Sequence, residues 1–92
     1  MGPAWFEDLR GRLTGLLIAL EDRLEEGDAR QVQEFIDVGE YGLALEEMAA
    51  ALAHGQTPIA NQERSDMLAL TDRMKMDDRV PRALQSCPRS GH

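Results

Sequence analysis

The chain has 92 residues and a formal net charge of −7, with 42% hydrophobic and 29% charged residues. This length allows one domain at most, and this composition is that of a folded globular protein rather than of a disordered chain. A core of this size leaves little room for a deep substrate pocket, so the sequence favours a protein that acts through its surface.

The first predicted element is a long amphipathic helix over residues 3–26. Pro3 suits the first helical position, and Glu7 and Asp8 suit the positive end of the helix dipole. Apolar residues recur at helical spacing at Trp5, Phe6, Leu9, Leu13, Leu16, Leu17, Leu20 and Leu24. Ile18 and Ala19 widen this stripe, which predicts that the middle of the helix is covered on most sides. Gly27 is expected to end the helix.

A second helix is predicted from Asp28 to the stop at Gly39. Gln31 follows Asp28 at the spacing of a capping box. Its inner face is formed by Val32, Phe35 and Ile36, and its outer face by Arg30, Gln33, Glu34 and Asp37.

The third helix is predicted from Glu40 to His54. Its buried stripe comprises Tyr41, Ala44, Leu45, Met48 and Leu52. Glu46, Glu47 and Leu43 lie off this stripe, which makes Leu43 an apolar residue without a place in the core.

After a loop at residues 55–60, a fourth helix is predicted over 61–74, capped by Ala60 or Asn61. Its buried side comprises Met67, Leu70, Thr71 and Met74. Residues 77–84 are compatible with a short fifth helix, since Pro81 falls in the first turn. The predicted fold is therefore an all-α, antiparallel up-and-down bundle of four helices, with the fifth left open. Residues 1–84 form the single domain around the first helix, and residues 85–92 a disordered tail.

Candidate residues for chemistry are few. Neither His54 nor His92 has a second ligand at metal-binding spacing, and the only cysteine, Cys87, has no neighbour that would clearly activate it. The paired carboxylates map to solvated faces, where nothing shifts their pKa for catalysis. We therefore expect no enzyme activity, no metal and no cofactor.

The acidic charge is concentrated in residues 27–56, which contain six Asp or Glu residues and a single Arg or Lys residue, Arg30. Such a segment repels the phosphates of nucleic acid and attracts a basic protein partner. Apolar runs such as Leu16 to Leu20 are far short of the roughly 20 residues of a membrane span. With one cysteine and no secretion signal, we expect a cytoplasmic protein that does not enter membranes.

The predicted binding site combines an aromatic residue with acids in this segment. Tyr41 and Leu43 lie within two helical turns of several carboxylates, and an apolar anchor rimmed by charge is typical of an interface hot spot. The partner-binding residues that we predict are Glu34, Asp37, Glu40, Tyr41, Glu46 and Glu47.

The run FIDVGEYGLALEEM at residues 35–48 resembles the central motif of the MafI-type bacterial immunity proteins, in which a short acidic helix leads through GE(Y/W)GLALE into the next helix. The run MLALTDRMKMD at residues 67–77 resembles the last helix of that family. The resemblance covers residues 10–84. It implies a cytoplasmic protein that neutralises a cognate secreted toxin, often a basic nuclease, by forming a tight complex with it.

Two hypotheses of function follow. The first is an immunity protein that occludes its toxin stoichiometrically. The second is a helical adaptor or self-associating module, which is motivated by Ile18, Leu43 and Leu68 lying off the main stripes. The sequence is compatible with a monomer or with a weak homodimer.

Overall fold

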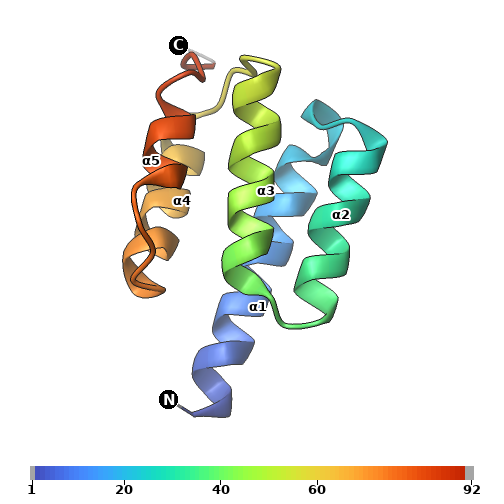
Figure 1. Ribbon diagram of the computed structural model, residues 1–92, viewed down its shortest axis with the longest axis vertical. Helices are drawn as coiled ribbons and strands as arrows, with labels where there is room; N and C mark the ends of the chain where they lie inside the picture. Colours follow the sequence, from blue (N-terminus) through green and yellow to red (C-terminus); the bar gives the residue numbers. More distant parts are fainter. Residues whose placement is uncertain (1, 91–92) are drawn as a thin grey trace.

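The computed structural model describes residues 2–90, which form five α-helices that run alternately up and down the molecule (Figure 1). The elements are α1 (Pro3–Leu20), a 3-10 turn η1 (Glu21–Arg23), α2 (Glu26–Asp37), α3 (Tyr41–His54), α4 (Asn61–Arg73) and α5 (Arg79–Leu84). The predicted all-α bundle is confirmed, and the optional fifth helix is present. None of these helices is long and apolar enough to cross a membrane.

The central helix is α3, which contacts α1, α2, α4 and α5. The expectation that the first helix is the core element is therefore wrong. The buried side of α3 includes Ala44 and Ala49, whose small side chains let the neighbouring helices approach closely. Helix α1 contributes five buried leucines to the same core: Leu9, Leu13, Leu16, Leu17 and Leu20.

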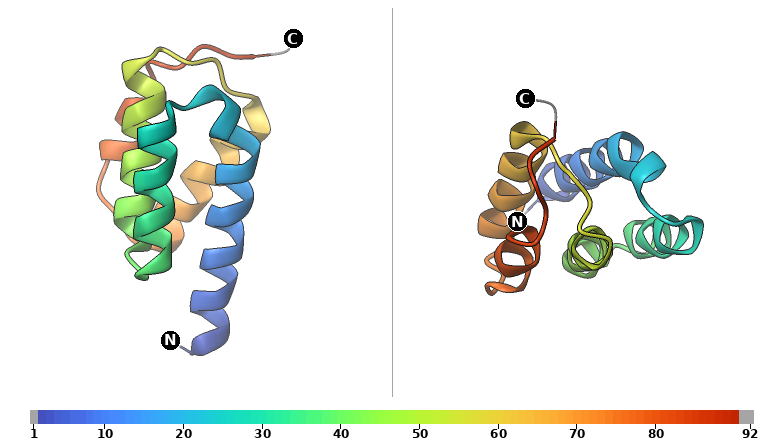
Figure 2. Two further views of the ribbon diagram at one scale, coloured as in Figure 1. Left: turned by 90° about the vertical axis from the view of Figure 1, so that its right-hand side faces the viewer. Right: turned by 90° about the horizontal axis from the view of Figure 1, so that it is seen from above.

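The middle of α1 is not covered on most sides, contrary to the sequence prediction. Ile18 is 64% exposed, and Ala19 is also exposed. The N-terminal turns of α1 extend beyond the neighbouring helices (Figure 2). This overhang explains why Phe6, although it belongs to the apolar stripe, is 47% exposed.

The boundary between α1 and α2 also differs from the prediction. Helix α1 ends at Leu20, and Gly27 lies inside the first turn of α2 instead of ending the helix before it. The N-cap is Glu25, whose carbonyl accepts a bond from the Ala29 N–H (3.0 Å). The acids at the start of α2 favour a helix N-terminus, which offsets the cost of a glycine there.

The turn from α2 to α3 matches the predicted stop at Gly39. Gly39 has φ of 79°, a conformation that glycine adopts without strain. Its N–H donates to the Ile36 carbonyl (3.1 Å), and the Glu40 N–H donates to the Phe35 carbonyl (2.8 Å). These two bonds form a Schellman motif, which fixes the direction in which the chain leaves α2.

Residues 85–90, expected to belong to a disordered tail, instead pack on the loop between α3 and α4. The Ile59 N–H donates to the Pro88 carbonyl (2.9 Å), and the Ser90 N–H donates to the Ile59 carbonyl (2.9 Å). Cys87 is only 4% exposed, which makes it part of the core. The remainder of the predicted tail, residues 91–92 with His92, lies outside the described residues.

Candidate functional site

The surface where α2 turns into α3 combines acidic and apolar side chains. Glu34, Asp37 and Glu40 are exposed, as the sequence predicted. Val38 and Leu43 are 71% and 45% exposed, so both leave apolar area in contact with water. We call this surface of five residues (Glu34, Asp37, Val38, Glu40 and Leu43) the α2–α3 corner.

The α2–α3 corner is held in one conformation and keeps its negative charge. The Schellman motif at Gly39 fixes the backbone between its two helices. Arg30, the only base within residues 27–56, pairs with Glu26 at 3.2 Å. Asp37 accepts a hydrogen bond from the Gln33 amide at 2.8 Å, and because this donor is uncharged it does not neutralise the carboxylate. The carboxylates of the corner are therefore available to a basic partner.

The other predicted contact residues lie elsewhere. Tyr41 is only 9% exposed, and its hydroxyl accepts a hydrogen bond from Arg10 Nε at 3.3 Å. Glu46 is half-buried and lies 3.7 Å from an Arg79 guanidinium nitrogen of α5. Glu47 is half-buried as well. The structure thus places three of the six predicted residues in the exposed corner and gives Tyr41 a position in the core.

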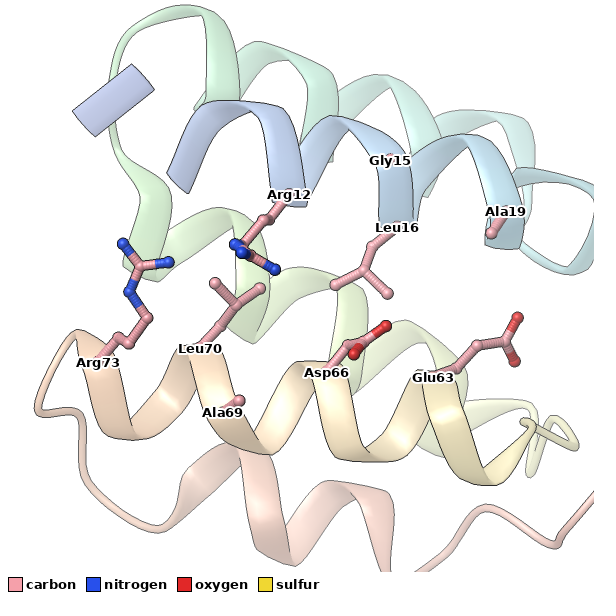
Figure 3. Close-up of a pocket in the computed structure, with 9 residues that line it drawn as sticks. All are labelled: Arg12, Gly15, Leu16, Ala19, Glu63, Asp66, Ala69, Leu70 and Arg73. Atoms are coloured by element: carbon pink, nitrogen blue, oxygen red, sulfur yellow. The ribbon is translucent and has the colours of Figure 1, made fainter. Parts of the chain in front are cut away.

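A second surface feature is a groove of about 470 Å³ between α1 and α4. We call it the α1–α4 groove; Figure 3 shows its lining side chains. Its lining comprises Arg12, Gly15, Leu16 and Ala19 of α1, with Glu63, Asp66, Ala69, Leu70 and Arg73 of α4. Leu16 of α1 and Leu70 of α4 both point into the space between the two helices, Leu16 opposite Asp66 and Leu70 beside Arg12, so part of the lining is apolar.

Each end of the α1–α4 groove is closed by ion pairs. At one end Asp8 accepts bonds from Arg73 (2.5 Å) and Arg12 (2.9 Å). These bonds, the one from Arg73 first, hold the pKa of the Asp8 carboxyl below its ordinary value. The Arg73 guanidinium also lies 5.9 Å from the centre of the Trp5 ring, within range of a cation–π contact. Two guanidinium groups therefore share one carboxylate at this end.

At the opposite end, Arg23 of η1 donates to both carboxylate oxygens of Glu63 (2.6 and 2.9 Å). Between the ends, the carboxylate of Asp66 points from α4 toward α1 (Figure 3). Asp66 accepts a hydrogen bond from Gln62 (2.8 Å) and forms no ion pair with a base among residues 2–90. The charge of Asp66 also interacts with that of Arg12 on the facing helix, so the charged groups of the groove largely pair with one another within the chain.

Groups suited to metal or covalent chemistry are scarce in the structure. Within residues 2–90, no three His, Cys, Asp or Glu side chains are placed together to hold a metal ion. The Cys87 thiol is buried, and this burial raises its pKa, which disfavours the reactive thiolate at neutral pH. Both surface features are suited to binding. The absence of catalytic activity stays a prediction.

Sequence reasoning missed the groove and the exposure of Val38. The groove had a signal, because Gly11, Gly15 and Ala19 recur at a spacing of four and therefore share one face of α1. That face is exposed on α1, next to the core residue Leu16, but only the position of α4 turns it into the wall of a groove. For Val38 we find no sequence signal, since valine beside a helix stop is as compatible with burial as with exposure.

Comparisons of the chain with protein-family models, with curated proteins and with solved structures gave no match.

Proposed function

We propose that this protein is an immunity protein that binds a basic toxin domain through the α2–α3 corner and neutralises it by occlusion. The single observation that carries the proposal is the composition of the corner: three exposed carboxylates and two exposed apolar side chains, Val38 and Leu43, within one helix–turn–helix segment of ten residues. The resemblance of residues 35–48 to the MafI-type motif supports the same interpretation.

The physical case rests on two complementary contributions. Val38 and Leu43 supply apolar area that a partner can exclude from water, which is how the centre of a hot spot gains affinity. The surrounding carboxylates attract a basic surface and raise the rate of encounter. Because a nuclease uses a basic surface to hold phosphates, a bound acidic corner would compete with its nucleic-acid substrate.

The test has two parts. Isothermal titration calorimetry measures binding to the toxin domain encoded next to this protein, and a co-expression assay measures whether toxicity is relieved. We expect a one-to-one complex that relieves toxicity. Leu43→Ala should weaken binding about tenfold or more, the loss of a hot-spot side chain. The paired change Asp37→Lys and Glu40→Lys should slow association.

Matched variants elsewhere distinguish the corner from a general acidic surface. Ile18→Ala removes another exposed aliphatic side chain, on α1, and Asp72→Lys reverses another exposed acid, on α4. Both should leave the affinity for the toxin unchanged. If Ile18→Ala weakened the complex and Leu43→Ala did not, the proposal that the α2–α3 corner binds the toxin would be contradicted. The absence of any complex would overturn the proposed function.

The alternative of a self-associating module keeps a structural argument of its own. Of the three residues that motivated it, Leu68 is half-buried against the core, but Ile18 and Leu43 are exposed. Ile18 lies on α1, next to Ala19 of the α1–α4 groove.

A further inference from the structure

We propose that α4 is a lid of the bundle: ion pairs at its two ends hold it against α1 and η1, and it opens while the rest of the fold stays closed. This inference does not depend on the proposed function, because the α2–α3 corner belongs to other helices. In Figure 2, α4 and α2 lie on different sides of the molecule, so the opening of α4 leaves the corner in place.

The packing of the helices separates α4 from α1. Helix α1 packs on α2 and α3, whereas α4 packs on α5 and α3, and the backbones of α1 and α4 hardly approach each other. The α1–α4 groove, of about 470 Å³, lies in the space between them. The side of α4 that faces α1 therefore gains little stability from the close packing of one helix on another.

Helix α4 also contributes less to the hydrophobic core than α1 and α3 do. Its buried side chains are Met67, Leu70 and Thr71, and the hydroxyl of Thr71 donates to the Met67 carbonyl of the same helix at 2.9 Å. Helix α3 has a similar length and buries six side chains. Because apolar burial is the main favourable contribution to closing an element, the smaller buried area of α4 lowers the free energy needed to detach it.

Two ion pairs join α4 to the first part of the chain, one at each end of the helix. In the first turn of α4, Glu63 binds Arg23 of η1, and in the last turn Arg73 binds Asp8 of α1. The side chains of Arg73 and Asp8 are 32% and 45% exposed, whereas that of Glu63 is only 16% exposed. An ion pair that water reaches contributes little to stability. The contact at Arg73 is therefore the weaker latch, and α4 releases first at its C-terminal end.

The other side of α4 supplies a hinge. Arg64 of α4 donates to the carbonyls of Leu84 and Cys87, which keeps α4 attached to α5 and to the residues after it, and α5 in turn packs on α3. The loops before and after α4 each contain a non-glycine residue with a positive φ, Gln56 at 48° and Lys75 at 52°. Because this conformation is strained for a residue with a side chain, an opening that lets both loops relax is favoured.

The experiment is native-state amide hydrogen exchange on the full chain, followed residue by residue by nuclear magnetic resonance over a series of low urea concentrations. Each rate is divided by that of the same amide in an unstructured peptide. We expect the interior amides of α4 to exchange about tenfold or more faster than the slowest amides of α2 and α3. Urea should accelerate α4 less than α3, because opening the lid exposes less surface than global unfolding.

Two substitutions separate the opening of the lid from global unfolding. Ile36→Val removes a buried methylene from α2, which packs on α1 and α3, and should accelerate the slowest amides of α2 and α3 about fivefold while leaving α4 unchanged. Arg73→Gln releases the weaker latch and should accelerate exchange in α4 about threefold. Arg30→Gln is the matched control, because the exposed pair of Arg30 with Glu26 lies within α2. It should leave the exchange of α4 unchanged.

Three outcomes would overturn the inference. One is a single opening free energy shared by the amides of α2, α3 and α4, with Ile36→Val accelerating all of them together. Another is that the slowest-exchanging amides of the chain lie in α4. The third is that Arg73→Gln accelerates exchange in α4 no more than Arg30→Gln does.

Discussion

Arg23 and Glu63 form a bidentate ion pair that joins η1 to the first turn of α4, with nitrogen–oxygen distances of 2.6 and 2.9 Å. The same Glu63 carboxylate accepts the backbone N–H of Ala60, the N-cap of α4, at 2.8 Å. Ala60 has no side-chain oxygen for the reciprocal bond, so Glu63 alone caps this helix. One carboxylate therefore holds a helix start and the end of the α1–α4 groove.

We expect the free energy of unfolding to report both contacts of Glu63. Glu63→Gln keeps an acceptor for Ala60 but removes the ion pair, and should cost about 1 kcal/mol. Glu63→Ala removes the cap as well and should cost about 2 kcal/mol. Urea unfolding measures both. Glu26→Gln breaks an exposed pair with Arg30 and should cost less than about 0.5 kcal/mol. Equal losses at Glu26 and Glu63 would contradict a structural role for this pair.

The same contact predicts how stability depends on pH. The hydrogen bonds from Arg23, and then the one from Ala60, hold the pKa of Glu63 below its ordinary value of 4.5. The unfolded chain then binds this proton first as the pH falls, so the stabilisation is present above about pH 4.5 and is lost through the lower, folded-state pKa. Urea midpoints between about pH 7 and pH 3 should fall more steeply for wild type than for Glu63→Gln. If the urea midpoints of the two proteins fell in parallel with pH, Glu63 would not contribute to the pH dependence of stability.

The sequence predicted the helices well where the signal was local. Apolar spacing located α3 and α4 within a residue or two, and Gly39 marked the end of α2 because its turn requires a positive φ. The outer face of α2 was also read correctly, since Glu34 and Asp37 are exposed. These features depend on side chains a few residues apart.

The errors concern contacts between distant parts of the chain. The apolar pattern continues to Leu24, but the helix ends at Leu20, where η1 places Arg23 against Glu63 of α4. The sequence places Tyr41 both on the buried stripe of the third helix and in the binding site; the structure confirms its burial, and its hydroxyl is bonded to Arg10 of α1. The groove likewise exists only because of how α1 and α4 are spaced, which no local pattern specifies.

At the ends of two helices, a non-glycine residue adopts a positive φ angle, a conformation in which glycine would be less strained. Gln56 and Lys75 have φ of 48° and 52°, and each occupies the position that Gly39 holds after α2. A left-handed conformation costs a non-glycine residue roughly 1 kcal/mol or more. Lys75→Gly should therefore raise the free energy of unfolding by about 0.5–1 kcal/mol, as should Gln56→Gly. Thermal and urea unfolding measure the gain.

Two controls separate backbone strain from other effects of these substitutions. Lys75→Ala removes the same charge without relieving the strain and should give no gain. Gly39→Ala introduces strain at φ of 79° and should cost about 1 kcal/mol. If Lys75→Ala stabilised the protein as much as Lys75→Gly, loss of the charge would be the cause.

The reactivity of Cys87 should report the packing of residues 85–90. Arg64 of α4 donates to the carbonyls of Leu84 and Cys87, both at 2.6 Å, and so ties this segment to the bundle. Cys87 is 4% exposed, and burial raises the pKa of its thiol. A thiol reagent such as Ellman's reagent should therefore modify the native protein slowly, because only an opened state exposes the thiol.

Arg64→Ala leaves both carbonyls without this donor and should accelerate modification about tenfold, equivalent to roughly 1.4 kcal/mol of opening free energy. Arg82→Ala is the matched control, since the side chain of Arg82 in α5 forms an exposed ion pair with Asp78, the N-cap of that helix. It should leave the rate near the wild-type value. Immediate modification of the wild-type thiol would instead mean that residues 85–90 are disordered, which is what the sequence predicts for residues 85–92.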